Sequence, residues 1–519
     1  MATARSLLRH GSTLSLLTMV SRALGLLREM TKARLLGTTA LSDAFSVAFM
    51  IPNLFRRLFA EGSIAVAFIP TFKKRLLEDS KDEIKNFLSC VFTFLTFFVT
   101  SAVVIGILLS PFLVSLFGLK EFDETVLLTR VMFPFLAFIS IAAFFQGVLN
   151  SVGVFTPSGV APILLNIVTI IGAYALKDIT GNPARAMASG ILVGGFLEAA
   201  IQLPFIVKKG FSFFFTGIRK AVKYSGTQTI LKLIGPTIIG MAAYQLNDLV
   251  STALAGNAGS GVVSSLQYSL RLQELILGIF AVSIGTVLLP DLAEHAKIGN
   301  WDLFSARLQS AVNIIALITV PITFFAMSQG ETLIRLLFQG QSFTEESVTL
   351  TKTAFTFHAP ALLFIALNRI LAPAFYAQSD TKSPTLAGII SFAVNITLAA
   401  ALAGKFRGAG IAFALTAAST VNTILLFCFL KKNPLVQMGG LLKQVLYIAK
   451  LCLFSAIASI PVLLLNPKLI AFSAGSNRFI HYGFPFVIAA SVYFSIGLAL
   501  LIVTKDAQTR KLMSIMKFR

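Results

Sequence analysis

The sequence predicts an all-α polytopic membrane protein, and three observations lead to this fold class. Hydrophobic residues make up 56% of the 519-residue chain, charged residues make up only 13%, and the mean hydropathy is +0.84. Soluble domains carry about twice that share of charged residues. Apolar runs of about 20 residues, long enough to cross a bilayer as a helix, recur from one end of the chain to the other.

Windows of this length give fourteen candidate transmembrane helices, and the even number places both termini on one side. In chain order their limits are 8–36, 43–70, 87–117, 126–150, 155–176, 186–207, 229–255, 262–290, 306–328, 347–375, 383–404, 408–430, 444–466 and 480–504. The first resembles a signal peptide, with basic residues ahead of a short apolar core. Its apolar pattern continues through "LGLLREMTKARLLG", so we expect it to remain part of the mature first helix.

The net charge of +21 does not indicate a nucleic-acid-binding protein, because the basic residues are not gathered in one soluble domain. Most lie in alternate loops between the apolar spans, on one predicted side of the membrane. These loops include "KKRLLEDSKDEIK", "KKGFSFFFTGIRKAVK", "KKNPLVQMGGLLK" and the tail "KDAQTRKLMSIMKFR". The positive-inside rule places that side, and therefore both termini, in the cytoplasm.

Repeated motifs predict two lobes. "LFAEGSIAVAFIPTF" ends the second span and "IFAVSIGTVLLPDL" ends the eighth; "FTPSGVAPILLNI" opens the fifth and "KSPTLAGIISFAVNI" opens the eleventh. Each pair is six spans apart, so we expect two six-helix lobes related by a pseudo-two-fold axis along the membrane normal, with a cavity between them. The predicted division is an N-lobe at 1–222, a C-lobe at 223–432, and two appended helices with the tail at 433–519.

Basic residues lie inside several candidate spans, and near the middle of a span they need an explanation. At mid-bilayer an arginine costs about 2.5–3.5 kcal/mol on insertion scales, so such residues imply a wet cavity, acidic partners, or both. The residues nearest the middle of their spans are Arg22, Arg56 and Arg271. Acidic residues inside the spans are about half as numerous as basic ones, so a positive surplus remains after any pairing. They are Glu29, Asp43, Glu61, Glu198, Asp248 and Glu274.

Helical spacing predicts two ion pairs, and it gives two adjacent arginines different directions around their helix. Arg57 and Glu61 are i,i+4, and Arg271 and Glu274 are i,i+3, so each pair shares a helix face. The side chains of Arg56 and Arg57 point about 100° apart around the helix axis, so they cannot both point directly into one cavity. We interpret Arg56 as lining the cavity and Arg57 as paired with Glu61. The sequence gives no rotation angle, so the reverse assignment stays open.

A cavity with surplus arginine suits an anionic, oxygen-rich substrate, since guanidinium groups bind phosphate bidentately and keep their charge. The chain has no GxxxxGK[ST], HExxH or GxSxG motif, so nothing in it indicates an ATP-driven pump or a hydrolase. We therefore expect a transporter rather than an enzyme, with no cofactor. The expected energy source is the membrane potential, a monovalent cation gradient or a partner protein.

Long motifs resemble those of a known family. "SRALGLLREMTKARLLGTTALSDAFSVAFMIPNLFRRLFAEGSIAVAFIPTF" is similar to the N-terminal motif of the MurJ (MviN) lipid II flippases, in the MOP exporter superfamily. "YSLRLQELILGIFAVSIGTVLLPDLAEHA" and "NRILAPAFYAQSDTKSPTLAGIISFAVNI" resemble the family's later motifs, and the likeness covers essentially the whole chain. The resemblance implies a bacterial inner-membrane flippase for undecaprenyl-pyrophosphate-linked disaccharide-pentapeptide. It also implies alternating access without ATP hydrolysis, and other cell-wall synthesis proteins as partners.

The resemblance also implies a set of cavity residues. In the family, arginines and an aspartate of the first two helices and an arginine of the eighth line the cavity. The matching positions are Arg22, Arg28, Asp43, Arg56 and Arg271, and Glu61 matches the acidic residue of the "FAEG" element. The last two spans resemble family helices proposed to form an apolar groove for the polyprenyl tail.

Two positions depart from the family pattern. Glu29 stands where relatives often have Asp, which keeps the charge on a longer side chain and leaves it a candidate for substrate binding. In the seventh span, relatives often carry an acid at the position of Ser251, and Asp248 lies one turn earlier. Asp248 is therefore a weak candidate for the sodium ligand described in some members.

Two other functions remain as alternatives. One is a flippase for a different polyprenyl-linked oligosaccharide, or a MATE-like drug or cation antiporter of the same superfamily. A cation exporter should carry an acidic midplane, whereas this midplane is basic. The other is a membrane scaffold in which every buried charge belongs to a structural ion pair.

Overall fold

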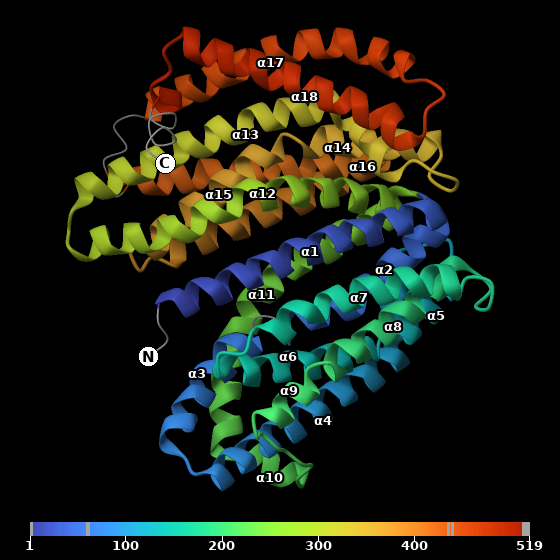
Figure 1. Cartoon of the computed structure of the whole chain (residues 1–519), viewed down its shortest axis with the longest axis vertical. Coiled ribbons are helices and arrows are strands. Elements are labelled where there is room, and N and C mark those ends of the chain that lie inside the picture. The colour runs from blue at the N-terminus through green and yellow to red at the C-terminus, as the bar shows by residue number, and fades with distance from the viewer. Residues whose placement is uncertain (1–3, 59–62, 433–435, 437–440, 511–519) are drawn as a thin grey trace. The chain divides into compact units, whose positions relative to one another are not determined.

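The computed structural model describes residues 4–58, 63–432, 436 and 441–510, with side chains outside 4–14, 63–66, 236–244, 279–288 and 441–442. The chain divides into two compact units, Met1–Ser264 and Ser265–Arg519. All the regular elements in the described residues are helices (Figure 1). This agrees with the predicted all-α class.

The helices of the first unit begin and end as follows: α1 Ala4–Leu36, α2 Ala40–Arg56, α3 Ser63–Glu78, α4 Lys81–Ser115, α5 Phe122–Met132, α6 Phe135–Ser151, α7 Thr156–Ala175, α8 Pro183–Ala200, α9 Leu203–Lys208, α10 Ile218–Lys223 and α11 Ser225–Asn257. Helix α12, Val262–Lys297, begins in the first unit and continues into the second. The second unit then holds α13 Trp301–Phe338, α14 Glu345–His358, α15 Ala361–Tyr376, α16 Lys382–Lys432, α17 Leu441–Phe472 and α18 Arg478–Val503.

Within the described residues, eight helical stretches are long and apolar enough to cross a membrane, or nine if α14 and α15, bent by 43°, form one span. They coincide with the predicted spans three to six and nine to fourteen. Predicted spans eleven and twelve both fall in α16, whose backbone is non-helical at Arg407, where the sequence places a turn between them. The chain is thus a multi-pass membrane protein, and the total of fourteen spans stays a prediction.

The other predicted spans, one, two, seven and eight, are helical in the structure but are not among these apolar stretches. They correspond to α1, to α2 with α3, to α11 and to α12. The second is interrupted, since α2 ends at Arg56 and α3 begins at Ser63, with residues 59–62 outside the described part. These same helices carry most of the charged residues singled out in the sequence.

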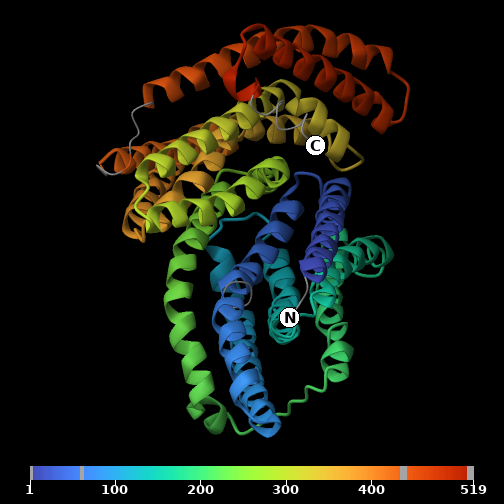
Figure 2. The same cartoon turned by 60° about the vertical axis from the view of Figure 1, so that its left-hand side comes forward.

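The unit boundary lies later in the chain than the predicted lobe boundary at 222/223. Helix α11, which the repeat assigns to the C-lobe, packs against α3 and α4 of the first unit, and Figure 2 shows it in green beside the blue α3. Compact units follow packing, whereas the lobes were predicted from sequence repeats. The lobe limits therefore stay a prediction.

Phenylalanine forms much of the core of the first unit. Phe68, Phe72 and Phe87 stack on one another with ring centroids 5.3–5.9 Å apart. The chain has 48 phenylalanines, and the rings of this one cluster fill the space between α3, α4 and α6. In the second unit, α17 and α18 pack on α13, where the Tyr493 hydroxyl donates to the carbonyl of Pro321 at 2.9 Å.

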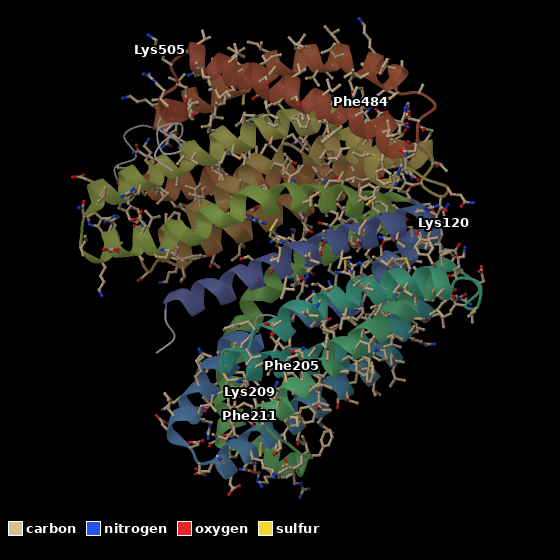
Figure 3. All side chains as sticks on the ribbon, in the orientation of Figure 1. Lys120, Phe205, Lys209, Phe211, Phe484 and Lys505 are labelled. Atoms are coloured by element: carbon tan, nitrogen blue, oxygen red, sulfur yellow. The ribbon has the colours of Figure 1, made fainter. Side chains whose placement is uncertain are left out.

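Between α9 and α10 the chain is extended and lies on α4. The backbone N–H groups of Phe214 and Thr216 donate to the hydroxyls of Ser89 and Thr93 at 3.1 and 3.0 Å. These bonds satisfy backbone donors that have no helical partner. Figure 3 shows Phe205, Lys209 and Phe211 at this end of the first unit and Lys120 at its other end. This arrangement agrees with the predicted loops, which place Lys120 and Lys209 on opposite sides of the membrane.

Candidate functional site

The first helix carries three of the predicted site residues. Arg28 pairs with its neighbour Glu29 at 3.0 Å, and each side chain is 18% exposed. The Arg28 guanidinium also lies 5.9 Å from the ring centroid of Phe49 on α2. Arg22 is exposed, on the same continuous helix, nearly two turns before Arg28. Helix α1 therefore presents two arginines and one acid, with the acid already engaged by Arg28.

Sequence reasoning did not single out Lys32, which the structure places at the junction of α1 and α2. Its side chain is only 4% exposed, and Nζ donates to the hydroxyl of Ser46 at 2.6 Å. The ammonium also lies 5.9 Å from the ring centroid of Phe45. The available signal was spacing, because Lys32 follows Arg28 by four residues and shares its helix face.

Asp43 is buried and binds the start of α12. Oδ2 accepts the backbone N–H of Gly261 at 2.6 Å, and Oδ1 accepts the backbone N–H and the hydroxyl of Ser264 at 2.8 and 2.7 Å. A carboxylate at a helix N-terminus satisfies free N–H groups and interacts favourably with the helix dipole. In this conformation Asp43 thus holds the first turn of α12 to α2, and its predicted part in substrate binding stays a prediction.

The two adjacent arginines at the end of α2 have different partners. Arg56 Nε donates to the Asn53 side-chain oxygen at 2.7 Å, within its own helix. The backbone widens into a π-helical turn at Arg57, whose guanidinium reaches α11. There it lies 3.5 Å from Gln245 Oε1 and 4.0 Å from Asp248 Oδ2.

These contacts do not test the predicted pairing of Arg57 with Glu61. Glu61, its predicted partner, lies outside the described residues. The partners that the structure does describe come from α11, far along the chain from Arg57. Arg57 and Asp248 are 34% and 43% exposed, so their pair is a weak one in energetic terms.

Arg271 and Glu274 lie on α12 in the second unit, and the predicted i,i+3 pair forms with an N–O distance of 3.1 Å. The opposite face of the helix is held by α14. The Ser269 hydroxyl lies 2.7 Å from His358 Nδ1, and the Gln273 amide donates to the His358 carbonyl at 2.8 Å. That carbonyl lies at the bend between α14 and α15, where the regular helical bonding is interrupted. These contacts fix the rotation of α12 about its axis within the second unit.

Within the described part of the chain, no group of three His, Cys, Asp or Glu residues is arranged to hold a metal ion. Asp248, the weak candidate from the sequence, lies beside Arg57 instead. A role for Asp248 as a cation ligand stays a prediction. The predicted set is divided between the units: Arg22, Arg28, Glu29, Asp43, Arg56 and Arg57 belong to the first, and Arg271 and Glu274 to the second.

A family model described as "Lipid II flippase MurJ" matches residues 32–483. The chain belongs to the MurJ lipid II flippase family. A probable lipid II flippase MurJ of Treponema pallidum (strain Nichols) is 45% identical over 525 residues, covering 100% of both chains. The lipid II flippase MurJ of Burkholderia cenocepacia is 31% identical, covering 83% of this chain and 85% of the relative.

Solved structures agree with the family. A MurJ structure described as the inward closed conformation has a TM-score of 0.77 at 25% identity, covering 95% of this chain and 99% of the other. An inward-facing multidrug resistance MATE transporter of the MOP superfamily has a TM-score of 0.66 at 14% identity, covering 81% and 97%. The second likeness shows a shared fold alone. MurJ membership therefore rests on the sequence matches and the first of these structures.

Proposed function

We propose that this chain moves lipid II from the inner to the outer leaflet of the bacterial cytoplasmic membrane. Full-length similarity to the Treponema pallidum relative is the observation that carries the proposal. The flippase acts as a transporter and not as an enzyme, since moving a lipid between leaflets makes and breaks no covalent bond. Both termini lie in the cytoplasm, as the distribution of basic loops indicates.

The basic residues of α1, α2 and α12 supply the chemistry of substrate binding. Arg22, Arg28, Arg56 and Arg271 bind the pyrophosphate, because guanidinium groups donate bidentate, charge-assisted hydrogen bonds to phosphate oxygens. Arg271 is held by Glu274, and Arg28 by Glu29, so these side chains reach the substrate with reduced conformational freedom. The partner acids also lower the cost of carrying charge in the membrane.

Transport proceeds by alternating access, driven by the membrane potential or a monovalent cation and without ATP. The sequence has no nucleotide-binding motif, which supports transport without ATP. Other cell-wall synthesis proteins are the expected partners, since the product is consumed by polymerisation on the outer side.

Reconstitution into proteoliposomes tests the proposal directly. Wild-type protein should move lipid II to the outer leaflet, and Arg22→Ala, Arg56→Ala and Arg271→Ala should each abolish that movement. Arg34→Ala is the matched control, since Arg34 lies exposed at the end of α1, where its charge reaches the headgroups. Normal flipping by all three variants would show that the arginines do not bind the substrate.

A flippase for another polyprenyl-linked oligosaccharide is the competing function. Depleting the protein in its host and identifying the lipid-linked precursor that accumulates in the inner leaflet separates the two. Accumulation of lipid II is expected. Accumulation of a different glycan lipid, with lipid II turned over normally, would replace the proposed substrate.

A further inference from the structure

A small open cavity with hydroxyl and amide groups in its lining lies in the first unit, where α1, α6 and α7 meet. Its volume is about 250 Å³, and its lining includes Thr18 and Ser21 of α1, Gln146 and Asn150 of α6, and Ser158 of α7. Figure 1 shows α1 and α7 side by side along this region, and the two helices are in contact. The side chains that line the cavity carry hydroxyl or amide groups or are apolar, and none is charged.

Several of these polar groups are available to a ligand. Asn150 Oδ1 accepts the Ser158 hydroxyl at 3.1 Å, which leaves the two donors of the Asn150 amide nitrogen. Among the residues that the structure describes, that nitrogen, the Gln146 amide and the Ser21 hydroxyl have no hydrogen-bond partner. Gln146 is exposed, and Asn150 is the last residue of the predicted span 126–150, so these groups lie where the headgroup of a lipid can reach them.

The cavity also has an apolar wall. Phe155, which precedes α7, and Pro162 complete its lining. An aromatic ring next to amides and hydroxyls suits a pyranose, whose C–H face packs on the ring while its hydroxyls take the hydrogen bonds. At about 30 Å³ for each water in the liquid, the volume corresponds to about eight waters, which is enough for one sugar ring.

The position on α1 connects this cavity to the proposed substrate. Ser21 is the residue directly before Arg22, which the proposed function assigns to the pyrophosphate. In lipid II the first sugar is bonded to that pyrophosphate, so its binding site must lie beside the phosphate-binding residues. The pyrophosphate needs cationic partners and the stem peptide carries charges, whereas neutral amides and hydroxyls match the hydroxyl and acetamido groups of the disaccharide.

We propose that this cavity binds a sugar of the lipid-linked substrate and so lets the protein distinguish the glycosylated lipid from its bare polyprenyl pyrophosphate. The inference rests on the proposed function and extends it. Gln146, Asn150 and Ser21 hydrogen-bond the sugar, and Phe155 packs against it. The arginines hold the phosphates of both lipids equally.

Binding of two purified lipids tests the site: lipid II, and undecaprenyl pyrophosphate, which has no sugar. Gln146→Met keeps the side-chain length and removes the amide, and Gln146 has no protein partner to lose. This variant should bind lipid II about tenfold more weakly, as expected for one or two lost hydrogen bonds, and bind undecaprenyl pyrophosphate as tightly as wild type. Ser21→Ala should show the same selective loss to a smaller extent.

Matched controls make the result decisive. Thr156→Val removes a hydroxyl at the start of α7 outside the cavity lining and should leave the affinity for both lipids unchanged. Arg22→Ala should weaken the binding of both lipids. Unchanged lipid II affinity in Gln146→Met, or an equal loss for the two lipids, overturns the sugar site while leaving the proposed function intact. Wild-type protein that binds neither lipid would instead overturn the proposed function.

Discussion

Asp43 Oδ1 accepts two hydrogen bonds from one residue, the backbone N–H of Ser264 at 2.8 Å and its hydroxyl at 2.7 Å. Asp43 Oδ2 accepts a third hydrogen bond, from the backbone N–H of Gly261, and the three bonds together join α2 to the start of α12. Sequence resemblance identifies Asp43 as a cavity residue, and the structure adds a second role as the cap of a long helix. The two roles predict different consequences of mutation.

Asp43→Asn should destabilise the protein by about 1–3 kcal/mol, because the amide nitrogen replaces one acceptor of buried N–H groups. Ser264→Ala removes only the hydroxyl bond and should cost about 1 kcal/mol. Thermal unfolding of purified protein in detergent measures both. If Asp43→Asn were as stable as wild type but inactive in flipping, the carboxylate would act on the substrate and not as a cap.

Arg56 and Arg57 should differ in function although they are neighbours. Arg57→Gln should keep most of the flipping activity and lower stability by less than about 1 kcal/mol, since its pair with Asp248 is half-exposed. Arg56→Gln should abolish flipping with little change in stability, because it removes a predicted phosphate ligand. Proteoliposome flipping and melting temperature are measured for both variants. The reverse pattern would assign the substrate contact to Arg57.

Gly190 lies at the closest approach of α7 and α8. A Cβ added there would meet the Thr169 Cα at 3.0 Å and two backbone carbonyl oxygens at 3.2 Å. With Gly194 it forms a GxxxG pattern, which lets membrane helices approach closely. Gly190→Ala should therefore lower the free energy of unfolding by about 1–3 kcal/mol.

Gly388 on α16 provides the control, because a Cβ there has no atom within 4 Å. Gly388→Ala should be neutral or stabilising by up to about 1 kcal/mol, as alanine favours a helix. Equal destabilisation by the two substitutions, measured by thermal unfolding, would contradict the packing argument.

Asp506, after α18, should make stability depend on pH. Burial opposes ionisation of its carboxyl, but hydrogen bonds from Thr509 and the Lys450 ammonium at 3.0 Å outweigh this and hold its pKa below the ordinary value. The folded pKa lies below the unfolded one, so the stabilisation is present at neutral pH and is lost as the pH falls through the folded value.

The measurement compares melting temperatures of wild type and Asp506→Asn from pH 7 to pH 3. The variant should be less stable at pH 7, and the difference should narrow below about pH 4, near the ordinary pKa of aspartate. A gap that stays constant over this range would mean that the carboxylate charge does not contribute.

The features that could be predicted from the sequence are those that depend on local periodicity. The apolar spans from 87–117 to 186–207 and from 306–328 to 480–504 coincide with helices, and the pair of Arg271 with Glu274 forms at its predicted spacing. Such features depend on residues within a few turns of one another, so hydropathy and helical geometry are sufficient to find them.

Long-range contacts could not be predicted in this way. Asp43 binds residues more than 200 positions later, and the described partners of Arg57 come from α11. Lys32 is a basic residue inside the first predicted span to which the sequence assigned no partner, whereas in the structure it is buried against Ser46. Each of these contacts is set by the tertiary packing of helices, which one sequence does not encode in any local pattern.

The extended segment on α4 has a practical consequence for engineering this transporter. The basic loop "KKGFSFFFTGIRKAVK" would be an obvious place to insert an affinity tag or a fluorescent reporter. Its backbone is instead fastened to Ser89 and Thr93, and Phe213 packs 4.6 Å from Phe92 between ring centroids. An insertion there would pull aromatic rings out of the core, whereas the turn at Gly299, where an added Cβ meets no atom within 4 Å, has room for one.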